Sequence, residues 1–169
     1  RERTGTLIFT FKKPFIPAPA AIGVCGTAAN SGVTHFCIAL CNVLHSRYLA
    51  RTAYLEVNAS HAVSSFSPES DQTIPFRHQG VSYYPEVTIR SLAELKQLPY
   101  KYKVLDFGVL TPHTLPEYVH CDYHVVFTNA GIWKTRQLEQ FLHVIGKNIG
   151  KDQIKKYSFR SEEHTSELQ

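Results

Sequence analysis

The feature that most constrains this sequence is a run of small and polar residues between a continuous apolar segment and a helical pattern. Residues 21–25 read Ala-Ile-Gly-Val-Cys, which is typical of a strand buried on both faces of a parallel sheet. From Phe36 to about His45, apolar residues recur at helical spacing. A strand, a small-residue turn and a helix in this order bring backbone N–H groups and a helix N-terminus together, and that geometry binds anions such as phosphate.

Further apolar segments alternate with helical patterns along the chain. The segments expected to form strands are 52–57, 81–84, 104–107 and 123–128. Of these, 81–84 is expected to be a short edge strand or a hairpin arm. Capping-box spacing at 91–94 and 114–117 predicts two helix starts, and a last helix is expected to end near Gly146. We therefore expect an α/β fold, three-layered and doubly wound around a mostly parallel sheet.

The length of 169 residues, with 43% apolar residues, is enough for one domain with its own core. Residues 1–19 break regular structure with prolines and lysines and are expected to be a linker or the end of a preceding segment. The domain is expected to span 20–159 and to be truncated at its C-terminus. Residues 160–169 resemble the translation of a sequencing-library adapter and are excluded from the fold.

The cysteines and the lack of a targeting segment indicate a cytoplasmic location, and the charge bears on contact with nucleic acid or a membrane surface. Without residues 160–169, Lys+Arg falls from 18 to 17 and Asp+Glu from 14 to 11, so the formal charge rises from +4 to +6. No dense Lys/Arg block is present, so solvated surface charge is favoured over contact with DNA or a membrane surface. The four cysteines form no CxxC pair, and no signal peptide or membrane-spanning apolar run is present.

The small-residue turn resembles the phosphate loop of the MinD/ParA-like (SIMIBI-class) P-loop ATPases, whose pattern is Gly-x-Lys-Gly-Gly-x-Gly-Lys-Thr. Gly26, Gly32 and Thr34 fall on matching positions. The resemblance covers about 21–146 and implies a sheet of the P-loop NTPase type. It also implies a nucleotide-binding role for ten residues: Gly26, Thr27, Ala28, Ala29, Asn30, Ser31, Gly32, Val33, Thr34 and His35.

Two departures from the pattern concern charge. Ala28 stands in the place of the family's signature lysine, and Val33 in the place of the lysine that reaches the β- and γ-phosphates. Neither side chain can neutralise the charge that develops in phosphoryl transfer. The resemblance therefore implies weak or absent binding of ATP and Mg²⁺. Weak nucleotide binding and a turn without a ligand remain equally open.

Two acidic residues complete the implied site. The segment 51–58 is similar to the family's second strand, with Glu56 and Asn58 in place of Asp-x-Asp, and 102–108 resembles the Walker-B strand, which ends in Asp106. The resemblance implies catalytic roles for Glu56 and Asp106, and Mg²⁺ contacts from Thr34 and Asp106. The segment from 121 to Trp133 is similar to the region where the family contacts adenine.

The expected function is regulation or scaffolding by a bacterial protein with a degenerate Walker A loop, acting through a protein partner or a homodimer. The CpaE/TadZ-like branch, linked to polar localisation and pilus assembly, includes members with degraded ATP sites, and it is named here by analogy. The alternative is an active ATP-dependent switch ATPase in protein localisation, pilus assembly or DNA partitioning. In that case Lys134 or a partner's lysine would replace the missing one.

Overall fold

The computed structural model describes residues 5–9, 18–67, 74–130 and 135–148. Its elements, in chain order, are β1 (Gly5–Phe9), β2 (Ala20–Gly26), α1 (Val33–Tyr48), β3 (Thr52–Glu56), the 3-10 helix η1 (Val63–Phe66), β4 (Phe76–His78), β5 (Val81–Tyr84), α2 (Ile89–Gln97), β6 (Tyr102–Val109), α3 (Leu115–Val119), β7 (Tyr123–Ala130) and α4 (Thr135–Asn148).

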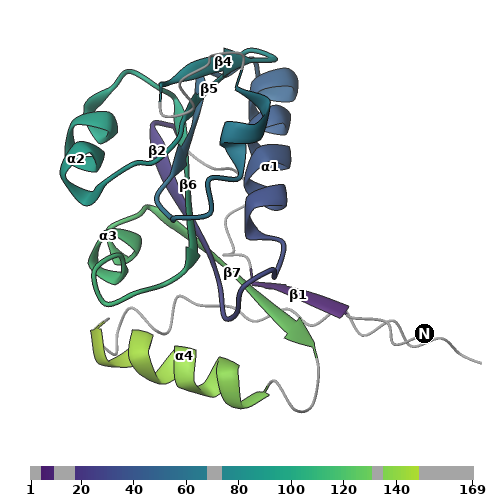
Figure 1. Ribbon diagram of the computed structural model, residues 1–169, viewed down its shortest axis with the longest axis vertical. Helices are drawn as coiled ribbons and strands as arrows, with labels where there is room; N and C mark the ends of the chain where they lie inside the picture. Colours follow the sequence, from purple (N-terminus) through teal and green to yellow (C-terminus); the bar gives the residue numbers. More distant parts are fainter. Residues whose placement is uncertain (1–4, 10–17, 68–73, 131–134, 149–169) are drawn as a thin grey trace, which may run out of the picture.

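The strands form one sheet of seven, in the order β1-β7-β2-β6-β3-β5-β4 (Figure 1). The five inner strands run parallel, and the two outermost, β1 and β4, pair antiparallel with their neighbours. The expected α/β fold with a mostly parallel sheet is therefore confirmed. Because the inner strands are parallel, their carboxyl ends meet at one edge of the sheet and their amino ends at the other.

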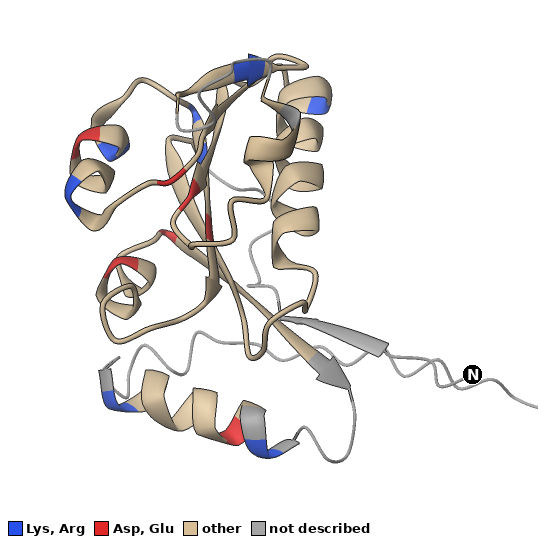
Figure 2. Cartoon of the chain, viewed as in Figure 1, with Lys and Arg blue, Asp and Glu red and all other residues tan. Residues whose placement is uncertain are grey.

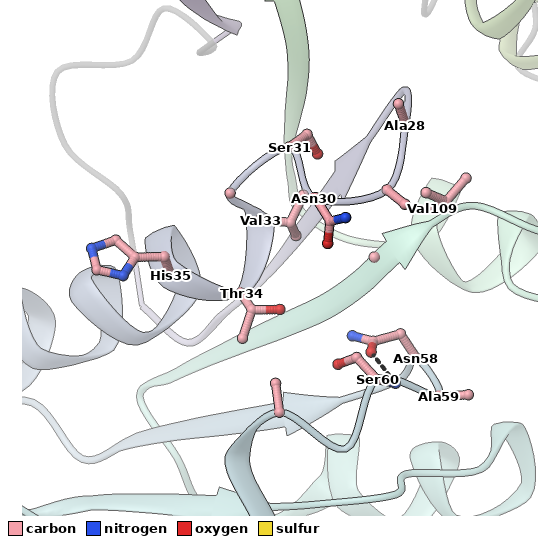
Figure 3. Close-up of a pocket in the computed structure, with 14 residues that line it drawn as sticks. Ala28, Asn30, Ser31, Val33, Thr34, His35, Asn58, Ala59, Ser60 and Val109 are labelled. Atoms are coloured by element: carbon pink, nitrogen blue, oxygen red, sulfur yellow. Dashed lines mark hydrogen bonds between the residues drawn. The ribbon is translucent and has the colours of Figure 1, made fainter. Parts of the chain in front are cut away.

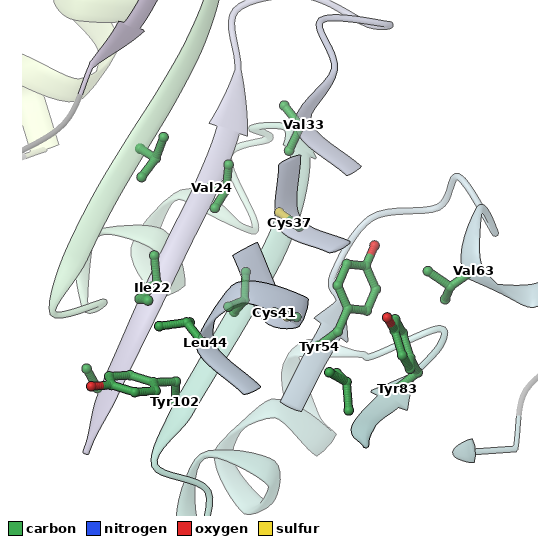
Figure 4. Packing of buried hydrophobic residues seen from close by; sticks show 14 of the residues in the cluster. Ile22, Val24, Val33, Cys37, Cys41, Leu44, Tyr54, Val63, Tyr83 and Tyr102 are labelled. Atoms are coloured by element: carbon green, nitrogen blue, oxygen red, sulfur yellow. The ribbon is translucent and has the colours of Figure 1, made fainter. Parts of the chain in front are cut away.

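Helices cover both faces of the sheet (Figure 1). On one face α1 packs its buried side, including Cys37, Cys41 and Leu44, against alternate residues of the strands such as Val24 and Tyr54 (Figure 4). The intervening strand residues pack on the other face with apolar residues of α2, α3 and α4. This alternation decides which polar side chains at the strand ends point toward α1.

The helix starts differ in detail from the sequence prediction. The N-cap of α2 is Thr88, three residues before the expected one, and Ser91 is its N3 partner. The Thr88 side chain accepts a hydrogen bond from Ser91 N (3.2 Å), and Ser91 Oγ accepts one from Thr88 N (3.1 Å). Serine thus takes the role that the prediction gave to glutamate. Thr114 does precede α3, but its hydroxyl accepts from Thr111 N and does not cap the helix.

Two strands differ from what the sequence predicts or make that prediction more specific. Residues 5–9, within the segment expected to be a linker or the end of a preceding segment, form β1 and pair with β7. The strand β5 is a hairpin arm, as one of the two options stated, but β4 lies outside it and so β5 is not at the edge. Trp133, Lys134 and residues 160–169 lie outside the described residues.

Candidate functional site

The loop between β2 and α1 lies at the carboxyl edge of the sheet and is tied to β7. Thr27 N donates to Phe127 O (2.8 Å), and Thr27 Oγ1 donates to Thr128 Oγ1 (3.1 Å). Further along, Asn30 has φ 58° and Gly32 has φ 89°. Asparagine is among the few residues other than glycine that enter this left-handed region readily. The sequence of the loop therefore suits its backbone.

Gly26 is required by a close approach at the base of this loop. A Cβ at Gly26 would lie 2.1 Å from Ser31 Oγ and 3.1 Å from both Ala28 O and Val33 Cγ2. Ser31 itself is buried. The loop therefore folds back on its own first residue, and any larger residue at position 26 would force it open.

A pocket of about 580 Å³ opens between this loop and two neighbouring strand ends (Figure 3). Its walls are residues 28–35, residues 58–60 with Ala62, and Gly108 with Val109. Eight of the ten predicted nucleotide-binding residues, from Ala28 to His35, therefore share one pocket. The other two, Gly26 and Thr27, line a second pocket of about 620 Å³ beside α3 and α4, and Val109 contacts both pockets.

The first pocket contains polar groups, and none of the described residues that line it is Lys or Arg. Thr34 and Asn30 extend toward its interior, whereas His35 points away from it and is exposed (Figure 3). Val33, in the lysine position of the resembling pattern, is 5% exposed and belongs to the α1-face core. No side chain caps the first turn of α1 and no acidic residue lies in it, so its N–H groups are free to meet an anion.

The two predicted catalytic carboxylates lie below the pocket floor. Glu56 and Asp106 are paired in register on β3 and β6, both point toward the α1 face, and both are 0% exposed. Neither lines the pocket. The structure thus brings the two acids together, but it separates them from the space that residues 28–35 surround.

Asp106 is held by internal donors on both oxygens. Tyr54 Oη donates to Oδ2 (2.8 Å), and Gly108 N donates to Oδ1 (2.9 Å). Burial, together with the charge of Asp106, raises the pKa of the Tyr54 hydroxyl, so Tyr54 remains a donor across the physiological range. Sequence reasoning missed Tyr54, although strand alternation places it two residues before Glu56 on the same face.

Glu56 is only half satisfied. Its Oε1 accepts hydrogen bonds from Ala62 N (2.8 Å) and Ser60 Oγ (3.0 Å), whereas its buried Oε2 has no hydrogen-bond partner in the described part of the chain. Burial is the main cause that raises the pKa of Glu56, and the nearby charge of Asp106 adds to it. Glu56 thus holds the loop that follows β3 through its hydrogen bonds, but these bonds require a carboxylate to be buried.

Mg²⁺ prefers several oxygen ligands in an octahedral arrangement. Thr34 offers a hydroxyl in the pocket, but both oxygens of Asp106 are engaged by Tyr54 and Gly108. Among the described residues, no group of three or more His, Cys, Asp or Glu side chains could hold a metal ion.

In the same described ranges, no helix is both long enough and apolar enough to span a bilayer. Comparison with known proteins adds no relative, since no protein-family model and no curated protein matches the chain.

Proposed function

We propose that this chain is a degenerate MinD/ParA-like P-loop protein with a regulatory or scaffolding role that binds ATP weakly or not at all. The observation that carries the proposal is the composition of the first pocket. It combines a backbone suited to anions with an uncapped helix N-terminus, but the described residues that line it include neither Lys, Arg nor a carboxylate. The pocket could therefore orient a phosphate without neutralising it.

The magnitude of this deficit follows from the contacts that two lysines would make. A hydrogen bond to a charged group contributes about 1.5–3 kcal/mol, so losing two such contacts weakens phosphate binding by roughly 10²–10⁴-fold. Hydrolysis is reduced further, because the acid that would assist Mg²⁺ is buried and bonded to Tyr54 Oη. A partner protein or a second copy of the chain is then the proposed means of action.

Isothermal titration calorimetry with ATP and Mg²⁺, followed by a phosphate-release assay, tests this proposal. We expect a Kd near or above about 1 mM, no turnover above background, and no change of either result in Asp106→Ala. Micromolar binding with turnover that Asp106→Ala abolishes would instead support the alternative, an active switch ATPase that obtains its lysine elsewhere. Light scattering at several protein concentrations, with and without ATP, then tests self-association.

A further inference from the structure

Exposed cations gather at the amino edge of the sheet, opposite the candidate site. The four side chains are Arg47 in the last turn of α1, Arg51 before β3, Arg77 in β4 and Lys101 before β6, and all are exposed. Figure 2 shows blue segments at the end of the molecule where β4 and the C-terminal end of α1 lie. These four residues are far apart in the sequence, so no dense run of Lys and Arg in the sequence indicates this surface.

Local contacts hold the elements of this edge together. Arg51 O accepts a hydrogen bond from Lys101 N (2.8 Å), and the Arg51 guanidinium lies 5.6 Å from the ring centre of Tyr100. The β4–β5 turn lies against α1, because a Cβ at Gly80 would come within 2.0 Å of His45 Nε2. The cations therefore belong to one surface carried by adjacent elements.

Acidic residues are few in the described loops of this edge; Glu94 and Glu117 precede two of these loops, near the C-terminal ends of α2 and α3, and Glu117 pairs with Lys96. In its described loops, 49–51, 79–80, 98–101 and 120–122, Asp122 is the one carboxylate, and its Oδ2 accepts a hydrogen bond from Ala21 N (2.7 Å). Glu56 and Asp106 lie at the opposite edge. The amino edge therefore presents a positive field that little negative charge offsets.

Exposed apolar side chains lie among these cations. Leu49 is 88% exposed and Tyr48 is 49% exposed, and both lie between Arg47 and Arg51 in the chain. Leu49 also has φ 48° and ψ 37°, the left-handed C-cap conformation that helices usually give to glycine. A leucine here stabilises neither the core nor the backbone, and its side chain is available for contact with a partner.

We propose that this amino-edge surface (Arg47, Tyr48, Leu49, Arg51, Arg77 and Lys101) docks the chain onto an anionic lipid bilayer. Leu49 and Tyr48 enter the interfacial layer, where apolar side chains gain free energy, and the four cations face lipid phosphates. A nucleic acid would satisfy the cations but would leave Leu49 among hydrated phosphates. The proposal does not depend on the nucleotide pocket at the other edge.

Vesicle co-sedimentation of the chain tests the proposal. We expect binding to phosphatidylcholine vesicles that contain phosphatidylglycerol, little binding to phosphatidylcholine alone, and release of the bound chain at about 1 M salt. Removal of each cation lowers the partition constant roughly fivefold, so Arg51→Glu with Lys101→Glu is expected to lower it by 25-fold or more, as a rough minimum.

Leu49→Gly separates membrane insertion from folding. Glycine relieves the left-handed backbone, so the melting temperature should stay the same or rise, while the partition constant falls about tenfold with the loss of the leucine side chain. The matched controls are Arg90→Glu on α2 and Leu142→Ala on α4. Both residues are exposed outside this surface, and both variants should bind as the parent does.

Three results would overturn the proposal. The first is no sedimentation with anionic vesicles at low salt. The second is binding that neither Leu49→Gly nor the Arg51→Glu, Lys101→Glu pair weakens. The third is tighter binding to a DNA duplex than to anionic vesicles, unchanged by Leu49→Gly, since that outcome would assign the cations to a nucleic acid.

Discussion

Replacing Tyr54 by phenylalanine removes one hydroxyl from the buried cluster beneath the pocket. The Tyr54 side chain is fully buried, and its hydroxyl donates to Asp106 Oδ2 at 2.8 Å. The ring remains in contact with that of Tyr83, with the ring centres 5.4 Å apart. Tyr54→Phe therefore leaves the packing nearly intact and deprives a buried carboxylate of one of its two donors.

The expected destabilisation is that of a hydrogen bond to a charged group, about 2 kcal/mol. With an m value of about 2 kcal/mol/M, the urea midpoint should fall by about 1 M at unchanged m. Circular dichroism during urea titration measures this shift. Tyr48→Phe is the matched control: Tyr48 is half-exposed, and its hydroxyl has no hydrogen-bond partner among the described residues, so its midpoint should stay within error of the parent's.

A double-mutant cycle assigns the effect to the Tyr54–Asp106 pair. In an Asp106→Ala background, Tyr54→Phe should lose most of its effect, because its acceptor is already gone. The reasoning is refuted if Tyr54→Phe destabilises by less than about 0.5 kcal/mol, or if the loss is equally large without Asp106. Either result would mean that Tyr54 does not hold Asp106.

Three further changes probe neighbouring features by urea denaturation. Burial raises the pKa of Glu56 above 4.5, so its contribution to stability is full at low pH and is lost as pH rises through the raised pKa. Glu56→Gln should therefore become more stable relative to the parent as pH rises from 4 to 7. A difference in unfolding free energy between the two proteins that stays equal or shrinks over this range contradicts this. Gly26→Ala should destabilise by about 1–3 kcal/mol, and Ser31→Gly should partly restore the stability. If the effects of the two substitutions simply add, the close approach of Ser31 to position 26 is disproved. Thr88→Ala should cost about 1 kcal/mol and Thr88→Ser much less, and equal losses would argue against the cap.

The main strands were predictable because each depends on its own residues. Mainly apolar segments at 21–25, 104–107 and 123–128 are unfavourable in water, and each forms a strand of the parallel sheet. The start of α2 was placed three residues too late because Ser91 resembles an N-cap residue, whereas tertiary context made it the N3 partner of Thr88. Local patterns thus identified the elements better than their boundaries.

The candidate site was predictable only in part. The order of strand, small-residue turn and helix grouped residues 28–35, and the structure places all of them along one pocket. The sequence could not show that Asp106 is bound by Tyr54, because that contact depends on the register of β3 against β6. It likewise could not show that Gly26 and Thr27 face a different pocket from the rest of the loop.

By itself, the sequence determined the α/β class and the absence of lysine at positions 28 and 33, since these depend on residue type and local order alone. The tertiary structure determined where the charged side chains lie. It buried Glu56 and Asp106 beneath the pocket, and it gathered Arg47, Arg51, Arg77 and Lys101 at the opposite edge. The physical reason is that parallel strands bring residues distant in sequence to a common edge, where each side chain's neighbours are set by strand register and strand order.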